Sequence, residues 1–176
     1  MLRLLGPVLV VLLLGGCQLA FDSPSAVPGS TAPPIDAGVR PEAPQRGTTA
    51  TATVTRVVDG DTLDVDVDGG GSESVRLIGI DTPEVFPEEE CGGREATRLI
   101  GSLAPVGTVV RLVSDPSQSD RDRFDRLLRY VELQDGTDLG AAQVASGWAE
   151  VVVFAAPFTR LGAYDRLAAS AGTPAC

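Results

Sequence analysis

Three short stretches concentrate side chains suited to phosphate chemistry: DGDT (59–62), RLIGIDTPE (76–84) and DRFDR (122–126). Their carboxylates are hard oxygen ligands of the kind that bind a divalent cation, and their guanidinium groups can hold phosphate oxygens by paired hydrogen bonds. The chain contains no histidine and no lysine, which excludes histidine catalysis and histidine metal sites. Acid–base work must therefore come from carboxylates, arginine or tyrosine. These residue types suit phosphodiester hydrolysis, in which a cation neutralises charge at the reacting phosphorus.

The aspartate run DVDVDG (64–69) invites a different interpretation, because it matches the start of an EF-hand calcium loop. That loop requires a bidentate glutamate at its twelfth position, which is Val75 here, and it requires flanking helices. Apolar and acidic residues alternate through the run, which indicates a half-buried strand with its acids in water. A calcium-binding surface module built from Asp64, Asp66 and Asp68 remains an alternative.

A series of short elements must position the three stretches. β-Branched or alternating patterns predict strands at 51–58, 62–68, 73–80, 108–114 and 127–133. Helices are expected at 93–103, 138–146 and 157–171, and an extended or irregular segment at 148–154. Five short strands, an intervening helix and two further helices predict a small α+β domain built on a barrel.

Taken together and in register, the three stretches resemble the thermonuclease, or staphylococcal-nuclease-like, family. The resemblance runs from about Thr53 to about Pro157 and includes CGGREA (91–96) at a predicted helix start. It implies a five-stranded OB-fold-type β-barrel with three helices. It also implies cleavage of DNA and RNA with a Ca²⁺-activated water, leaving 3′-phosphates.

The resemblance assigns a role to six residues. The carboxylates of Asp61 and Asp81 and the backbone carbonyl of Thr82 would bind Ca²⁺. Glu84, free of the metal, would position or deprotonate the water. Arg76 and Arg126 would hold the phosphate.

Each of these residues also has an ordinary structural interpretation. Asp61 can cap the turn after Gly60, and the Asp-Thr-Pro sequence at 81–83 is a common turn opening. Arg126 lies in a segment where arginines alternate with aspartates (120–129), so a surface ion-pair mesh is the alternative there.

The chain departs from the family pattern in charge and in aromatic residues. Its net charge is −10, with the excess in residues 51–176, which argues against tight binding to a polyanion by charge alone. Val153 and Ala155 stand where the family often has tyrosines that flank the bound nucleotide, and strand alternation predicts that Phe154 points to the other face. Asp125 replaces the usual glycine before the second arginine.

The first fifty residues differ from the rest. Residues 1–16 predict a lipoprotein signal peptide, because the apolar run Leu4–Leu14 is short for a membrane span and Gly-Gly-Cys follows it. The resemblance to bacterial lipoprotein signals implies acylation of Cys17. A plain signal peptide remains the alternative. Residues 17–50 carry the lipidated cysteine and a linker predicted to be disordered, and residues 51–176 form the nuclease-like domain.

Export leaves two further cysteines on an oxidising side of the membrane. Cys91 and Cys176 are therefore expected to form a disulfide, with two free thiols as the alternative.

The sequence thus predicts a nuclease that is exported and anchored to the outer face of the bacterial cell membrane as a lipoprotein. Its expected substrates are DNA and RNA, its expected cofactor is Ca²⁺, and a monomer is expected. The alternative is a catalytically weak or inactive domain of the same fold that acts as a nucleic-acid-binding or scaffolding lipoprotein.

Overall fold

The computed structural model describes residues 47–172, whose centre is a closed five-stranded β-barrel. Residues 1–46 and 173–176 lie outside the described part. The predicted signal peptide, Cys17 and Cys176 therefore lie outside it as well.

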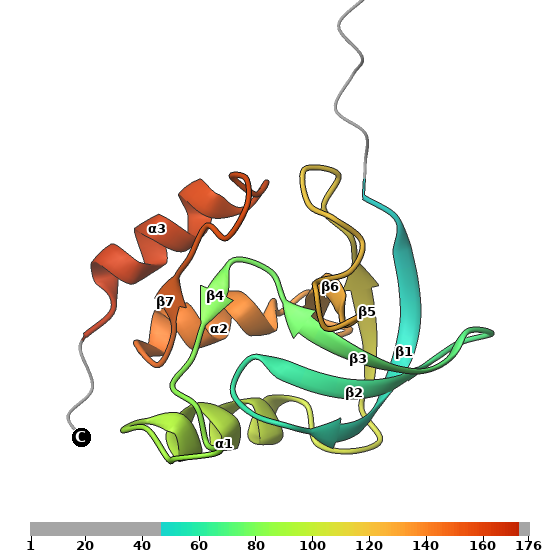
Figure 1. Cartoon of the computed structure of the whole chain (residues 1–176), viewed down its shortest axis with the longest axis horizontal. Coiled ribbons are helices and arrows are strands. Elements are labelled where there is room, and N and C mark those ends of the chain that lie inside the picture. The colour runs from blue at the N-terminus through green and yellow to red at the C-terminus, as the bar shows by residue number, and fades with distance from the viewer. Residues whose placement is uncertain (1–46, 173–176) are drawn as a thin grey trace, which may run out of the picture. The chain divides into compact units, whose positions relative to one another are not determined.

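The barrel begins with an antiparallel meander of β1 (Thr49–Val57), β2 (Thr62–Val67) and β3 (Gly71–Leu77). β3 then pairs in parallel with β6 (Leu127–Glu132), and β5 (Val109–Val113) pairs with both β6 and β1 to close the ring. Figure 1 shows this order, which confirms the predicted OB-fold-type barrel.

Alternation along β2 decides which side chains fill the barrel. Leu63 and Val65 are fully buried, whereas Asp66 is exposed. Asp64 forms an ion pair with Arg56 of the neighbouring strand β1, with 2.6 Å between Asp64 Oδ2 and Arg56 Nη2. Asp64 and Asp66 stand in β2 and Asp68 in the turn toward β3, so the run lies in a hairpin with a wet face, as the alternation predicts.

Three helices complete the domain: α1 (Gly93–Leu103), α2 (Leu139–Ser146) and α3 (Leu161–Ser170). α2 contacts both α1 and α3, and Figure 1 shows the three helices beside the barrel. The side chain of Asp138 caps the start of α2 by accepting a hydrogen bond from the Ala141 amide at 3.2 Å. No helix within residues 47–172 is long and apolar enough to cross a membrane.

The region predicted as one strand (73–80) contains a turn that shapes the site. β3 ends at Leu77, and the chain turns through Gly79 (φ 78°) into the short strand β4 (Ile80–Asp81), which pairs with β7 (Glu150–Val151). A Cβ atom at Gly79 would lie 2.3 Å from the Phe158 ring, so the turn needs glycine.

Candidate active site

A pocket of about 580 Å³ opens beside the end of β3 and brings four of the predicted residues together. Its lining includes Arg76 from β3, Asp81 from β4, Glu84 from the following loop and Arg126 from the loop before β6. The other two predicted residues, Asp61 and Thr82, are buried next to this group.

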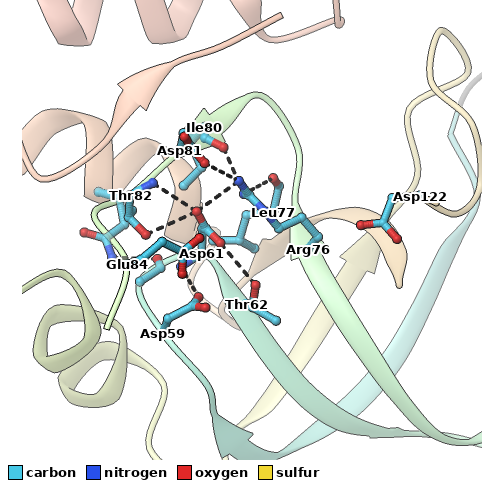
Figure 2. A network of polar contacts seen from close by, with 12 residues as sticks. Asp59, Asp61, Thr62, Arg76, Leu77, Ile80, Asp81, Thr82, Glu84 and Asp122 are labelled. Carbon is cyan, nitrogen blue, oxygen red and sulfur yellow. Dashed lines mark hydrogen bonds and ion pairs between the residues drawn. The ribbon is translucent and has the colours of Figure 1, made fainter. Parts of the chain in front are cut away.

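Asp61 is the buried centre of the polar network in Figure 2. Only 4% of the residue is exposed, and its carboxylate accepts hydrogen bonds from the Thr82 amide at 3.0 Å, the Thr82 hydroxyl at 3.1 Å and the Thr62 hydroxyl at 3.1 Å. Burial raises the pKa of Asp61 to about 6, and the charge of nearby Asp59 adds to the rise, while Arg76 opposes it. The alternative in which Asp61 only caps the turn after Gly60 is wrong, because its carboxylate bonds to Thr62, Thr82 and Arg76.

Arg76 joins the two predicted metal-binding carboxylates. Its Nη2 lies 3.0 Å from Asp61 Oδ2 and 2.7 Å from Asp81 Oδ1, and Figure 2 shows the guanidinium between them. Its Nη1 donates to the carbonyls of Leu77 at 3.2 Å and Ile80 at 2.9 Å. Arg76 is therefore not an ordinary surface residue, because the turn after β3 curls around its head group.

Glu84, like Asp81, is an exposed carboxylate of the pocket. Burial raises its pKa, and the negative charges of Asp59, Asp81 and Glu90 raise it further, while Arg76 opposes the shift. The Glu84 amide donates to Glu90 Oε2 at 3.0 Å, which ties the acidic loop that follows to the pocket. A carboxylate whose pKa lies above its ordinary value is a better proton acceptor than a fully solvated one.

Arg126 joins the same hydrogen-bond network from the loop before β6. Its Nη2 lies 2.7 Å from Asp122 Oδ2, and its Nη1 donates to Thr62 Oγ1 at 3.3 Å. Since the Thr62 hydroxyl donates to Asp61, Thr62 connects the arginine wall to the buried carboxylate. Asp125, where the family usually has glycine, adopts a left-handed conformation (φ 66°).

The predicted ion-pair mesh around Arg126 is present among the described residues, together with the pocket. Arg121 pairs with Glu73 at 2.8 Å, and Arg129 pairs with Asp120 at 2.5 Å. These pairs brace the loop before β6, so the ion-pair interpretation is confirmed for this segment, and Arg126 lines the pocket as well. Thr62 and Asp122 had no predicted role, although both stand inside the motifs that carried the prediction.

Two exposed phenyl rings also line the pocket, Phe124 at 64% and Phe154 at 69% exposure. The guanidinium of Arg76 lies 5.8 Å from the centre of the Phe154 ring. The prediction that Phe154 points away is wrong, because β7 ends at Val151 and strand alternation does not continue. Phe158 is buried against Gly79.

The predicted metal site consists of hard oxygen donors. Among residues 47–172, no three or more acidic, histidine or cysteine side chains are grouped to hold a metal ion. The predicted set, however, needs only the carboxylates of Asp61 and Asp81 with the Thr82 carbonyl. Both carboxylates already contact one cationic nitrogen of Arg76, and burial of Asp61 favours a positive partner. The residues present therefore fit a hard divalent cation such as Ca²⁺.

Comparison with known proteins agrees with this geometry. The family model described as "Staphylococcal nuclease homologue" matches residues 74–172, more than half of the chain. The chain belongs to the staphylococcal nuclease homologue family. The match includes five of the six predicted residues and leaves out Asp61, which contacts Arg76 and Thr82 of the matched segment.

Several curated relatives of this nuclease family are similar to the chain. A protein named "Uncharacterized endonuclease" from Escherichia coli O157:H7 is 35% identical over 98 residues, which are 56% of this chain and 58% of the relative. The thermonuclease of Staphylococcus hyicus is 38% identical over 86 residues, 47% of this chain and 48% of its own. Endonuclease YncB of Bacillus subtilis is 31% identical over 112 residues, 61% and 51% respectively. The chain thus spans only about half the length of these relatives.

Proposed function

We propose that this chain is a metal-dependent phosphodiesterase, an endonuclease of DNA and/or RNA that uses Ca²⁺. The observation that carries the proposal is the convergence of Arg76, Asp81, Glu84 and Arg126 on one pocket, with Asp61 bonded behind them. Family membership and the names of the relatives agree with this activity.

The chain's own residues divide the work. Arg126 and the pocket edge of Arg76 bind the oxygens of the scissile phosphate and hold it in line with an incoming water. Glu84 accepts a proton from that water as its oxygen bonds to phosphorus. The bond from phosphorus to the 5′ oxygen then breaks, and this oxygen takes up a proton, which leaves a 3′-phosphate and a 5′-hydroxyl. A Ca²⁺ ion held by Asp61, Asp81 and the Thr82 carbonyl would neutralise the charge that develops on the phosphate oxygens.

A digest of single-stranded DNA and of RNA tests this function. The full-length chain should cleave in CaCl₂ and not in EDTA. Glu84→Gln and Arg126→Ala should each lower the rate by about 100-fold or more. Asp165→Asn and Arg166→Ala are matched controls, because both residues are exposed and neither lines the pocket. If the wild type cleaves no faster than the pocket variants, the enzyme proposal fails.

A second candidate function is binding or scaffolding without cleavage. It is favoured by the ion pairs that occupy Arg76 and Arg126 and by the net charge of −10. The same digest separates the two candidates, because a binding protein would retain oligonucleotides in CaCl₂ and release no products.

We also propose export and anchoring through an acylated Cys17, supported by the apolar run and the Gly-Gly-Cys sequence at its end. Cys17→Ala should move the protein from the membrane fraction to the soluble fraction of the expressing bacterium.

A disulfide between Cys91 and Cys176 is proposed for the exported form. Mass spectrometry of the unreduced protein should show the linked peptides, and two free thiols would contradict it.

A further inference from the structure

Most of the positive charge that lines the pocket is already neutralised within the described part of the chain. Arg121 forms two hydrogen bonds of 2.8 Å with the carboxylate of Glu73. Arg126 is paired with Asp122, and Arg76 with its two aspartates. Arg123 is the one pocket-lining arginine in residues 47–172 with no ion pair, and its guanidinium lies 4.6 Å from the Phe124 ring centre.

The rim on the Glu84 side carries the opposite charge. The Glu90 amide donates to the Glu84 carbonyl at 2.8 Å, and the Glu84 amide donates back to the Glu90 side chain. This closed loop follows the pocket residue Glu84 and presents Glu88, Glu89 and Glu90 as exposed residues, of which Glu89 pairs with Arg94 at 2.7 Å. A strand leaving the pocket over this rim would bring phosphates toward carboxylates.

These two features limit what a long nucleic acid can gain from the protein. Affinity for a polyanion grows with each phosphate that a cationic side chain neutralises, because each such contact releases condensed counterions. Among the pocket-lining arginines of residues 47–172, only Arg123 is without an ion pair and can take a flanking phosphate, and the surface beyond the pocket belongs to a domain that carries the whole net charge of −10. Extra chain length therefore adds repulsion instead of contacts.

We infer that the site recognises a short run of nucleotides, the scissile phosphate and its immediate neighbours, so that its substrate class is short oligonucleotides and locally accessible single-stranded segments. The inference rests on the proposed function and deepens it. It predicts that chain length beyond a few nucleotides brings no advantage per cleavable bond, and that salt weakens binding only slightly. The acidic rim at 88–90 sets this limit.

The test compares thymidine oligonucleotides of two lengths, a tetranucleotide and one of about 40 nucleotides, over a series of KCl concentrations at fixed CaCl₂. The full-length chain, purified in mild detergent, should give kcat/KM values per bond that agree within about threefold. With one or two neutralised phosphates, the slope of log(kcat/KM) against log salt should lie between about −0.7 and −1.4. A long substrate favoured more than about tenfold per bond, or a slope steeper than about −3, would overturn the inference.

A charge-reversed rim makes the test specific. Glu88→Lys with Glu89→Lys leaves the Glu84–Glu90 hydrogen bonds in place and should raise kcat/KM on the long substrate by about tenfold at low salt, with a steeper slope and no change on the tetranucleotide. Asp68→Lys with Asp165→Lys is the control, because both aspartates are exposed and stand outside the loop that closes on Glu84, and the two substitutions change the net charge by the same amount. An equal gain in this control would assign the effect to net charge and overturn the role of the rim.

Binding measurements separate this inference from the proposed function. Fluorescence anisotropy with the same two labelled oligonucleotides reports affinity and its salt dependence whether or not the chain cleaves. Similar affinities with a shallow slope and no cleavage would reject the nuclease proposal and retain the short-substrate inference. Cleavage together with tight binding of the long oligonucleotide alone would retain the nuclease proposal and reject the short-substrate inference.

Discussion

Asp122 holds Arg126 by its backbone and its side chain at once. Asp122 Oδ1 accepts a hydrogen bond from the Arg126 amide at 3.0 Å, and Oδ2 accepts one from Arg126 Nε at 2.7 Å. The same carboxylate also accepts from the Phe124 amide at 2.9 Å. Burial alone would raise the pKa of Asp122, but these hydrogen bonds outweigh it and lower the pKa below the ordinary value. Asp122 therefore fixes the direction from which Arg126 enters the pocket.

Asp122→Ala should lower kcat/KM on single-stranded DNA by about tenfold, because Arg126 then loses its fixed orientation before a phosphate arrives. Asp122→Asn keeps an acceptor for the two amides and should recover part of the loss. Asp68→Ala is the control, since Asp68 is exposed and does not line the pocket. Unchanged or higher activity in Asp122→Ala would mean that the Asp122–Arg126 ion pair does not help Arg126 to bind the phosphate.

The barrel and α1 were predictable from local patterns, whereas the contacts of the site were not. Alternation and β-branched residues locate the strands, and the predicted helix at 93–103 has the observed bounds. Alternation failed at Phe154, because β7 pairs with β4 over two residues only, and the chain then leaves the strand. The junction of β3 and β4 depends on Gly79 fitting beneath Phe158, a contact across about eighty residues that no local pattern reveals.

The motifs predicted which side chains gather in the site but not how they are engaged. Arg76 was expected to face a phosphate, yet its Nη1 donates hydrogen bonds to two carbonyls of the turn that follows β3. Such a hydrogen-bonding pattern depends on the path of the backbone after β3. The turn that needs Gly79 is also the turn whose carbonyls accept hydrogen bonds from the Arg76 guanidinium, so the position of this proposed site residue depends on the fold.

The two exposed phenyl rings should contribute to substrate affinity. Stacking of a base on an aromatic ring is worth about 1–3 kcal/mol, so Phe124→Ala and Phe154→Ala should each raise KM by about 5- to 150-fold with little effect on kcat. Phe86→Ala is the matched control, because Phe86 is 80% exposed but does not line the pocket. A similar rise in KM for all three variants would show that general surface hydrophobicity, and not stacking in the pocket, is responsible.

Calcium binding should depend on the pocket and not on the aspartate-rich hairpin. Titration calorimetry of the wild type should show one site, and Asp81→Asn should weaken it by at least about tenfold because a charged ligand is lost. Asp66→Asn should bind as the wild type does, since Asp66 lies on the exposed face of β2 and accepts a hydrogen bond from Ser72. The opposite pattern would restore the surface calcium module as the better interpretation.

The last prediction concerns stability, through Asp115, which is 4% exposed and bonded to three segments of the fold. It accepts hydrogen bonds from Tyr130 of β6, from the Thr159 amide at 2.6 Å just before α3, and from the Ser117 amide at 2.9 Å. Burial would raise its pKa, but these hydrogen bonds outweigh that cost and lower the pKa to about 2. The ionised carboxylate thus ties the loop before β6 to α3.

A carboxylate with a lowered pKa stabilises the fold at pH values above its unfolded pKa of 3.8, and this contribution disappears as the pH falls toward the folded value of about 2. Asp115→Asn should therefore lower the free energy of unfolding by about 2 kcal/mol at pH 7, and its gap to the wild type should close between about pH 4 and pH 2. Urea denaturation at several pH values measures this gap. Asp135→Asn is the control, because Asp135 also caps a turn amide but is exposed, and its substitution should change the stability much less. A gap for Asp115→Asn that stays constant down to pH 2 would show that shape, and not the ionised carboxylate, holds α3 against the barrel.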